Sequence, residues 1–137
     1  MSEKREPQEW IRQWWFPILQ FDHVYIAYLP NKDRDGKRFD VRPWETKALR
    51  LQGKLFGGAT SWPSRGAYRL IDVEGRIRRG ILLEETRMVT SFIAEEQFTE
   101  ENIKAVTDFL QEFGRKSNQQ SVAFAVDDGM HYILLKD

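Results

Sequence analysis

Few residues of this 137-residue chain combine a reactive side chain with a spacing that indicates chemistry. Neither His23 nor His131 stands in a His-x-x-x-His or Glu-x-x-His spacing, so neither predicts a metal site. The adjacent carboxylates Glu84 and Glu85 would point to opposite faces of a strand, which argues against a paired-carboxylate mechanism within that dipeptide. The sequence therefore assigns no catalytic residue. If the chain is an enzyme, Glu84 with His23 or His131 is the candidate for acid-base roles.

The sequence offers more candidate residues for ligand binding than for catalysis, because three arginines are expected on one face of a hairpin. Residues 68–93 predict two long strands, and Glu74-Gly75 predicts the tight turn between them, since glycine supplies a positive φ angle. This turn sets a register in which Val73 faces Arg76 and Ile71 faces Arg78. Guanidinium groups bind carboxylates and phosphates through paired donors. The candidate binding residues of this face are Arg69, Arg76 and Arg78.

The same hairpin needs an irregularity further along. Strict alternation beyond Gly80 would turn Glu85 and Arg87 toward the buried face. A β-bulge near Gly80 would return apolar residues to the core instead. The alternation leaves two sets open for burial: Val89 with Ile93, or Met88 with Phe92.

An aromatic segment precedes the first predicted strand. Pro7 favours a first helical turn, and Pro17 should end the helix near Phe16 because it lacks a backbone N–H. Between them, large aromatic side chains recur at helical spacing and form one stripe. We interpret the stripe as an anchor for another chain, because tryptophan is typical of binding hot spots. The alternative is a flap that packs on the domain. The residues concerned are Trp10, Trp14 and Trp15.

Composition restricts the class of protein. The length predicts one domain, and the absence of cysteine excludes disulfides and thiolate zinc sites. No apolar run is long enough to span a bilayer, and the polar start lacks a signal-peptide core, so we expect a cytoplasmic protein. Residues 1–80 carry 16 Lys and Arg against 10 Asp and Glu, whereas residues 81–137 carry 5 against 11. This asymmetry can steer an anionic partner or pair two copies head to tail.

Periodicity predicts the remaining elements and the fold. An apolar run at residues 23–29 predicts a central strand, and apolar stripes predict helices at 43–55 and 99–113. Thr99 should cap the second helix and Gly114 should end it. Residues 122–126 lead through a turn at Asp128-Gly129 into a final strand.

This element order contains βαββαβ and resembles the ferredoxin-like fold, which implies an antiparallel sheet with two helices on one face. We therefore predict an α+β protein. Residues 1–20 form the N-terminal aromatic helix or arm, and residues 21–137 form a single sandwich domain with an added C-terminal hairpin strand.

Two short patterns concern possible ligands. Residues 24–29 resemble the first-strand ribonucleoprotein motif of RNA-recognition domains, in which an aromatic side chain stacks on a base. Residues 31–36 have the opening spacing of a calcium loop, but Arg42 stands where the bidentate Glu is required, so we expect a solvated turn.

Taken together, these patterns predict a non-enzymatic interaction or regulatory module without metal or cofactor. It would bind a protein partner or a second copy through the aromatic helix and the open sheet face. The first alternative is nucleic-acid or polyanion binding through the arginine face. The second is a small ferredoxin-like enzyme, and none of the three involves a membrane.

Overall fold

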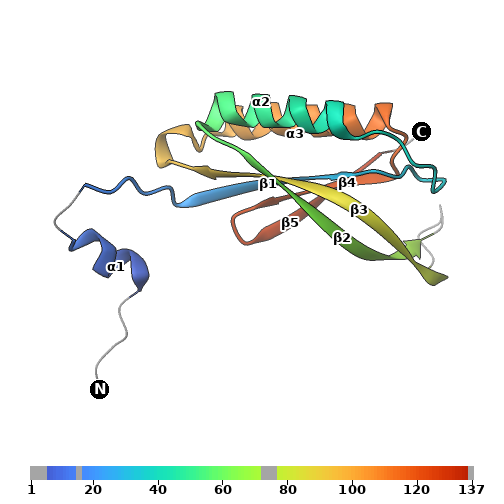
Figure 1. Ribbon diagram of the computed structural model, residues 1–137, viewed down its shortest axis with the longest axis horizontal. Helices are drawn as coiled ribbons and strands as arrows, with labels where there is room; N and C mark the ends of the chain where they lie inside the picture. Colours follow the sequence, from blue (N-terminus) through green and yellow to red (C-terminus); the bar gives the residue numbers. More distant parts are fainter. Residues whose placement is uncertain (1–5, 15–16, 72–76, 136–137) are drawn as a thin grey trace, which may run out of the picture.

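The computed structural model describes residues 6–14, 17–71 and 77–135, with the side chains of residues 68–71 and 77–82 outside the description (Figure 1). In chain order the elements are α1 (Pro7–Arg12), β1 (His23–Pro30), α2 (Arg42–Phe56), β2 (Thr60–Ile71), β3 (Ile77–Ile93), the 3-10 helix η1 (Glu95–Gln97), α3 (Glu100–Lys116), β4 (Ser121–Val126) and β5 (Gly129–Leu134).

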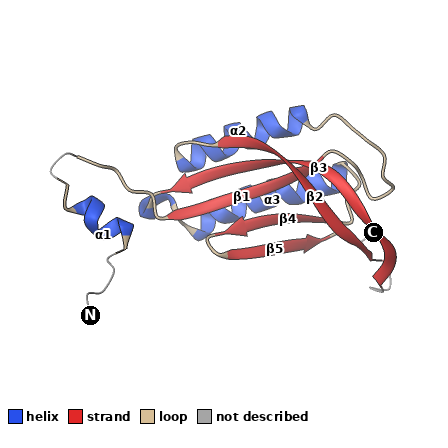
Figure 2. Cartoon of the chain, turned by 60° about the horizontal axis from the view of Figure 1, so that its bottom comes forward, coloured by secondary structure: helices blue, strands red, loops and turns tan. Residues whose placement is uncertain are grey.

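The five strands form one antiparallel sheet in the order β2-β3-β1-β4-β5. Helices α2 and α3 lie side by side on the same face of this sheet (Figures 1 and 2). This arrangement confirms the predicted ferredoxin-like fold, with β5 added at the edge beside β4. Strand β1 is central, as predicted, because it pairs with β3 on one side and β4 on the other.

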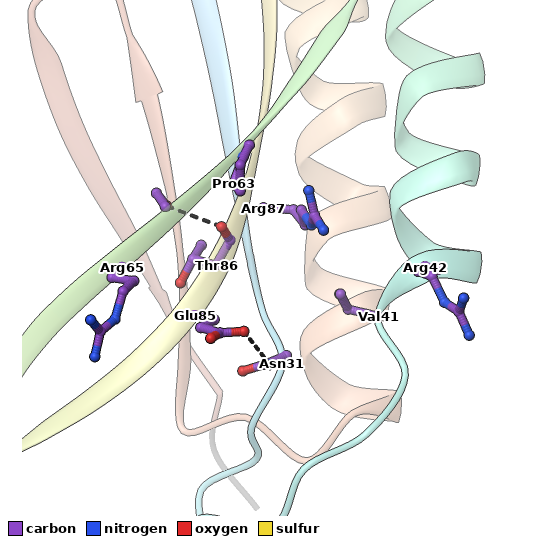
Figure 3. A pocket seen from close by; sticks show the side chains of 9 residues that line it. Asn31, Val41, Arg42, Pro63, Arg65, Glu85, Thr86 and Arg87 are labelled. Atoms are coloured by element: carbon purple, nitrogen blue, oxygen red, sulfur yellow. Dashed lines mark hydrogen bonds between the residues drawn. The ribbon is translucent and has the colours of Figure 1, made fainter.

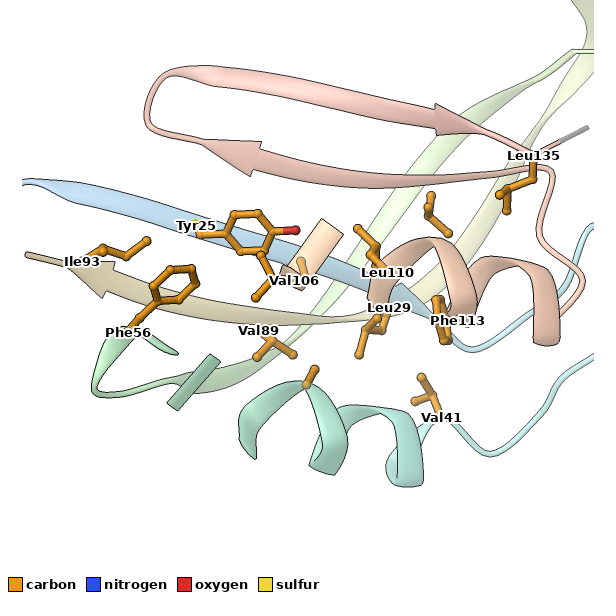
Figure 4. Packing of buried hydrophobic residues seen from close by; sticks show 13 residues of the cluster. Tyr25, Leu29, Val41, Phe56, Val89, Ile93, Val106, Leu110, Phe113 and Leu135 are labelled. Carbon is orange, nitrogen blue, oxygen red and sulfur yellow. The ribbon is translucent and has the colours of Figure 1, made fainter. Parts of the chain in front are cut away.

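The core lies between β1 and the two helices. Tyr25, Ala27 and Leu29 alternate along β1 and are fully or almost fully buried, so this face of the strand points at the helices (Figure 4). Leu110 and Phe113 of α3 pack into the same cluster. Because Tyr25 is wholly buried and in contact with Phe56 and Phe124 of the core, its ring is not available to stack on a base.

A buried amide fixes α2 on the sheet. Gln52 is almost fully buried, and its Nε2 donates to the carbonyl of Val89 at 3.1 Å and to Oγ of Ser91 at 3.1 Å. The Ser91 hydroxyl in turn donates to the carbonyl of Gly58 at 2.8 Å. These bonds satisfy polar groups that would otherwise cost free energy in the core, and they set the position of α2 along β3.

Helix α3 begins as predicted and ends later than predicted. The Thr99 hydroxyl accepts a hydrogen bond from the backbone N–H of Asn102 at 3.1 Å, which confirms the N-cap. The helix continues past Gly114 to Lys116. A Cβ built on Gly114 would lie 2.8 Å from Cγ1 of Val122 and closer still to the Leu135 side chain, so this glycine permits close packing and is not a cap.

The β2–β3 hairpin contains the predicted bulge. The strand pairing beside this bulge differs from the predicted register. Arg69 pairs with Ile81 and Ile71 pairs with Ile77, so a step of two residues on β2 matches four on β3. The additional residues lie at 78–80, which confirms an irregularity near Gly80. The expected pairing of Ile71 with Arg78 is wrong, and the turn at Glu74-Gly75 lies outside the described residues.

Beyond the bulge, β3 turns one of the two possible sets of side chains inward. Val89 and Ile93 are fully buried, whereas Phe92 is largely exposed on the opposite face. The second hairpin also differs by one position, because Val126 pairs with Gly129 and the turn residues are therefore Asp127 and Asp128. Asp127 adopts a φ of 51°, a left-handed conformation that aspartate tolerates better than most residues.

The aromatic helix is shorter than predicted. Helix α1 ends at Arg12 and has no buried residue. Trp10 and Trp14 have ring centroids 5.6 Å apart and are 38% and 45% exposed, while Trp15 lies outside the described residues. Within the described part of the chain, no helix is long and apolar enough to cross a bilayer.

The role of Gly114 can be tested with two alanine substitutions. We expect Gly114→Ala to lower the free energy of unfolding by about 1–3 kcal/mol, because the added methyl group overpacks the contact with Val122. Gly53→Ala is the matched control: Gly53 lies inside α2 with open space around it, so this change should stabilise by about 0.5–1 kcal/mol. Urea unfolding of both variants measures the difference, and equal effects would contradict the packing role.

Candidate functional site

An open cavity of about 490 Å³ lies at one end of the sheet, where the β2–β3 hairpin passes the end of β1 and the start of α2 (Figure 3). Its walls combine charged, hydroxyl and amide side chains with apolar surface that includes Val41 and Pro63. The residues that line it are Asn31, Val41, Arg42, Pro63, Ser64, Arg65, Glu85, Thr86 and Arg87.

Unequal strand lengths create this cavity. Strand β1 ends at Pro30, which pairs with Thr86, whereas β2 and β3 remain paired beyond that point. The chain crosses from β1 to α2 in a loop held by Asp33, whose Oδ1 accepts from the backbone N–H groups of Asp35 and Lys37 at 2.9 Å each. These bonds agree with the expectation of a turn at residues 31–36. Helix α2 begins only at Arg42, so neither helix fills the space beside the hairpin.

The charges of the cavity are partly paired. Arg42 makes two bonds to the Asp40 carboxylate, at 2.9 and 3.0 Å, and points away from Glu85 (Figure 3). Nε of Arg87 lies 3.4 Å from Glu45 Oε2, and Arg65 stands opposite Glu85 in the strand pairing. The cavity can therefore receive a ligand that carries both a carboxylate and a positive charge.

Two oxygen atoms of the cavity residues are buried without a hydrogen-bond partner among the described residues. They are Oγ1 of Thr86, a residue only 5% exposed, and Oδ1 of Asn31. The Asn31 amide donates to Glu85 Oε2 at a long 3.5 Å. Buried polar atoms are almost always hydrogen-bonded, so orphaned acceptors beside a polar cavity indicate a place where a ligand completes the bonding.

Glu84 lies on the other side of β3 from Glu85 and does not line the cavity. Its carboxyl group is half-buried, and this burial raises its pKa, while the nearby charge of Lys32 opposes the shift. A raised carboxyl pKa is a property of acid-base groups in active sites. Glu84 therefore remains a candidate for proton transfer.

Neither histidine accompanies Glu84, so the expected acid-base pairing is wrong. His23 is opposite Ile93, nine residues along β3 from Glu84, which corresponds to about 30 Å. His131 lies on β5, three strands from β3, and stacks on Phe124. The pairing of strands, which the sequence does not show, separates these residues.

His23 instead joins three parts of the fold. Its Nε2 lies 2.7 Å from Glu95 Oε2 and its Nδ1 lies 3.0 Å from Asp127 Oδ2, while the ring stacks on Phe98 with centroids 3.7 Å apart. Hydrogen bonds to Asp127 and then to Glu95 raise the pKa of His23 above its usual value. Both ring nitrogens can donate only in the imidazolium form, so this geometry favours the charged ring.

None of the other predicted binding residues is among the described residues that line the cavity. Arg76 lies outside the described residues, and the structure describes the backbone of Arg69 and Arg78 without their side chains. Trp10 and Trp14 lie in the N-terminal arm, away from the cavity (Figure 1). Among the described residues, no three His, Asp or Glu side chains gather where they could hold a metal ion.

Sequence reasoning missed the cavity residues Ser64 and Thr86 as possible ligand contacts, and it considered Asn31 only as part of a calcium-loop pattern. They come from three different elements and form no motif, so no spacing could have identified them. The one available signal was the failure of strand alternation at Glu85 and Arg87, which marks the place where the hairpin leaves the covered part of the sheet.

Comparisons with known proteins supply a likeness of fold. No family model matches the sequence, and no curated protein is significantly similar to it. Two similar solved structures are of a phage SAM lyase. The one in complex with S-methyl-5'-thioadenosine has a TM-score of 0.62 at 12% identity and covers 89% of this chain and 96% of its own. The apo structure has the same TM-score and identity, with coverage of 88% and 96%.

These neighbours correct one expectation from the sequence. The prediction of a non-enzymatic interaction module is wrong, since the solved structures that share this fold over nearly the whole chain are of an enzyme. The sequence suggested an interaction module because it contains clustered aromatic residues and arginines but no catalytic motif. At 12% identity the likeness itself establishes the fold and transfers no residue roles.

The contacts of His23 predict a dependence of stability on pH. Because the folded-state pKa is raised, the stabilising contribution of the imidazolium is fully present below about pH 6.5, the usual histidine value, and is lost as pH rises through the raised pKa. We expect the difference in melting temperature between wild type and His23→Gln to be largest near pH 6 and to shrink on the alkaline side. His131→Gln is the control, and a difference that does not vary with pH would contradict the prediction.

Proposed function

We propose that this chain is a small lyase that cleaves S-adenosylmethionine or a closely similar sulfonium nucleoside, with the cavity beside β1 as its ligand site. The observation that carries the proposal is the pair of orphaned buried oxygens, on Thr86 and Asn31, in a cavity lined by charges of both signs. The likeness of fold to a SAM lyase directs the choice of ligand class.

The ligand and the cavity are chemically complementary. S-adenosylmethionine carries a carboxylate, an ammonium group and a sulfonium centre, together with ribose hydroxyls and an adenine amine. Arg65 and Arg87 can bind the carboxylate, while Glu85 attracts the positive groups. The buried oxygens of Thr86 and Asn31 can accept hydrogen bonds from a hydroxyl or from the adenine amine.

The proposed reaction balances without any oxidant or reductant. Release of S-methyl-5'-thioadenosine breaks the bond between the sulfonium sulfur and the γ-carbon of the methionyl chain. The electron pair goes to sulfur, which becomes a neutral thioether. The γ-carbon then either bonds to the carboxylate of the same substrate or forms a double bond after the β-carbon loses a proton to a base. Both routes are lyase reactions, because the carbon–sulfur bond is cleaved without consumption of water.

The first test is turnover by the purified chain. Incubation with S-adenosylmethionine should yield S-methyl-5'-thioadenosine, identified by liquid chromatography and mass spectrometry. A folded protein that neither forms this product nor binds it in calorimetry would contradict the proposed function.

Substitutions in the cavity test the location of the site. We expect Glu85→Gln to raise KM about 10- to 100-fold, since a hydrogen bond to a charged group contributes about 1.5–3 kcal/mol. Thr86→Val should raise KM about 3- to 10-fold and leave the protein as stable as before or more stable, because it removes an orphaned buried hydroxyl. Thr90→Val on the same strand lies outside the cavity and should change neither quantity.

Glu84→Gln distinguishes a role in turnover from a role in ligand binding. We expect this variant to bind S-methyl-5'-thioadenosine as wild type does, because Glu84 does not line the cavity. Loss of turnover with unchanged binding would identify Glu84 as the acid-base group. Loss of binding would show that the ligand site extends along β3 to Glu84.

A further inference from the structure

Three arginines line the cavity, and they differ in whether a carboxylate of the protein already holds them. Arg42 makes two bonds to Asp40, at 2.9 and 3.0 Å. Nε of Arg87 lies 3.4 Å from the carboxylate of Glu45, a side chain that is only 15% exposed. Within the described part of the chain, the exposed side chain of Arg65 has no ion pair or hydrogen bond. Arg65 is therefore the guanidinium of the cavity whose donors are available to a ligand.

An acidic residue lies beside Arg65 and does not pair with it. The strand register sets Arg65 directly opposite Glu85, and side chains at opposite positions of antiparallel strands share a face, with Cβ atoms about 4.5–5.5 Å apart. The Glu85 carboxylate turns instead toward Asn31, whose amide donates to its Oε2 at a long 3.5 Å (Figure 3). A cation and an anion thus lie next to each other in the cavity without an ion pair between them.

We infer that Arg65 and Glu85 form the subsite for the α-amino-acid end of the ligand, an inference that rests on the proposed function. Arg65 binds the α-carboxylate through paired N–H donors, and Glu85 binds the α-ammonium group. Oδ1 of Asn31, which is buried without a hydrogen-bond partner among the described residues, is a second acceptor for the ammonium group. The two charged groups of an amino acid are attached to one carbon, so adjacent residues of opposite charge match their separation.

This subsite predicts which ligands the cavity selects. An α-amino acid supplies a partner to both charged residues, whereas an amine without the carboxylate leaves Arg65 unpaired. Arg87 does not substitute for Arg65, because it would leave the largely buried carboxylate of Glu45 without its cation. The substrate is therefore restricted to sulfonium nucleosides that carry an intact amino acid.

Calorimetry with two ligands tests the subsite. S-adenosylhomocysteine carries the amino acid on a neutral sulfur, whereas S-methyl-5'-thioadenosine lacks the amino acid. We expect Arg65→Gln to weaken binding of S-adenosylhomocysteine about 10- to 100-fold, because paired hydrogen bonds to the carboxylate are lost. Binding of S-methyl-5'-thioadenosine should not change. Arg65→Lys should recover part of the loss, since lysine keeps the charge but not the paired donors.

Arg50→Gln is the matched control. Arg50 is exposed on α2 and does not line the cavity, so this variant loses the same charge at a distance from the ligand. It should bind both ligands as wild type does. Circular dichroism of each variant confirms that the protein is folded.

Three results would overturn the inference. They are a wild type that does not bind S-adenosylhomocysteine, a folded Arg65→Gln protein that binds it as wild type does, and an equal loss of affinity for both ligands in that variant. A wild type that binds S-adenosylhomocysteine through Arg65 but does not cleave S-adenosylmethionine would instead refute the lyase function and support the subsite. The inference and the proposed function are therefore distinguished by their failures.

Discussion

The burial of β1 beneath two helices is the constraint on which the rest of the structure depends. One face of β1 supplies Tyr25, Ala27 and Leu29 to the core, and the apolar stripes of α2 and α3 can be buried only against that same face. Gln52 then fixes α2 along β3 through two hydrogen bonds. A two-layer protein built in this way covers one side of its sheet and leaves the other side exposed.

The candidate site arises from the limits of that two-layer packing. Strands β2 and β3 have 12 and 17 residues against 8 in β1, so the hairpin extends past the part of the sheet that the helices cover. Two oxygen atoms at this junction, Oγ1 of Thr86 and Oδ1 of Asn31, are buried without a hydrogen-bond partner among the described residues. The same geometry that completes the core thus leaves a polar cavity at its end.

Exposed apolar residues and a polar cavity point to two separate properties of one molecule. The cavity favours recognition of a small charged ligand, and the apolar surface is a separate feature of the open sheet face. Interpreting the aromatic and arginine patterns alone led to an interaction module, because residues of the cavity are dispersed over the chain and have no diagnostic spacing. The fold shared with an enzyme corrected that interpretation.

Local patterns in the sequence determined the elements of this protein. The apolar run of β1, the stripes of α2 and α3 and the Thr99 cap depend on neighbours within a few residues, so they were predictable, and their order indicated the ferredoxin-like sheet. The bulge at residues 78–80 was also signalled, by failed alternation.

Contacts between distant residues were decided only by the tertiary structure. His23 is hydrogen-bonded to Asp127, 104 positions away, and to Glu95, 72 positions away. Close packing against Val122 requires a glycine at position 114, and Asn31 bonds to Glu85 where β1 ends. No local spacing encodes such contacts, because they follow from strand order and register, which the whole chain sets through the packing of its core.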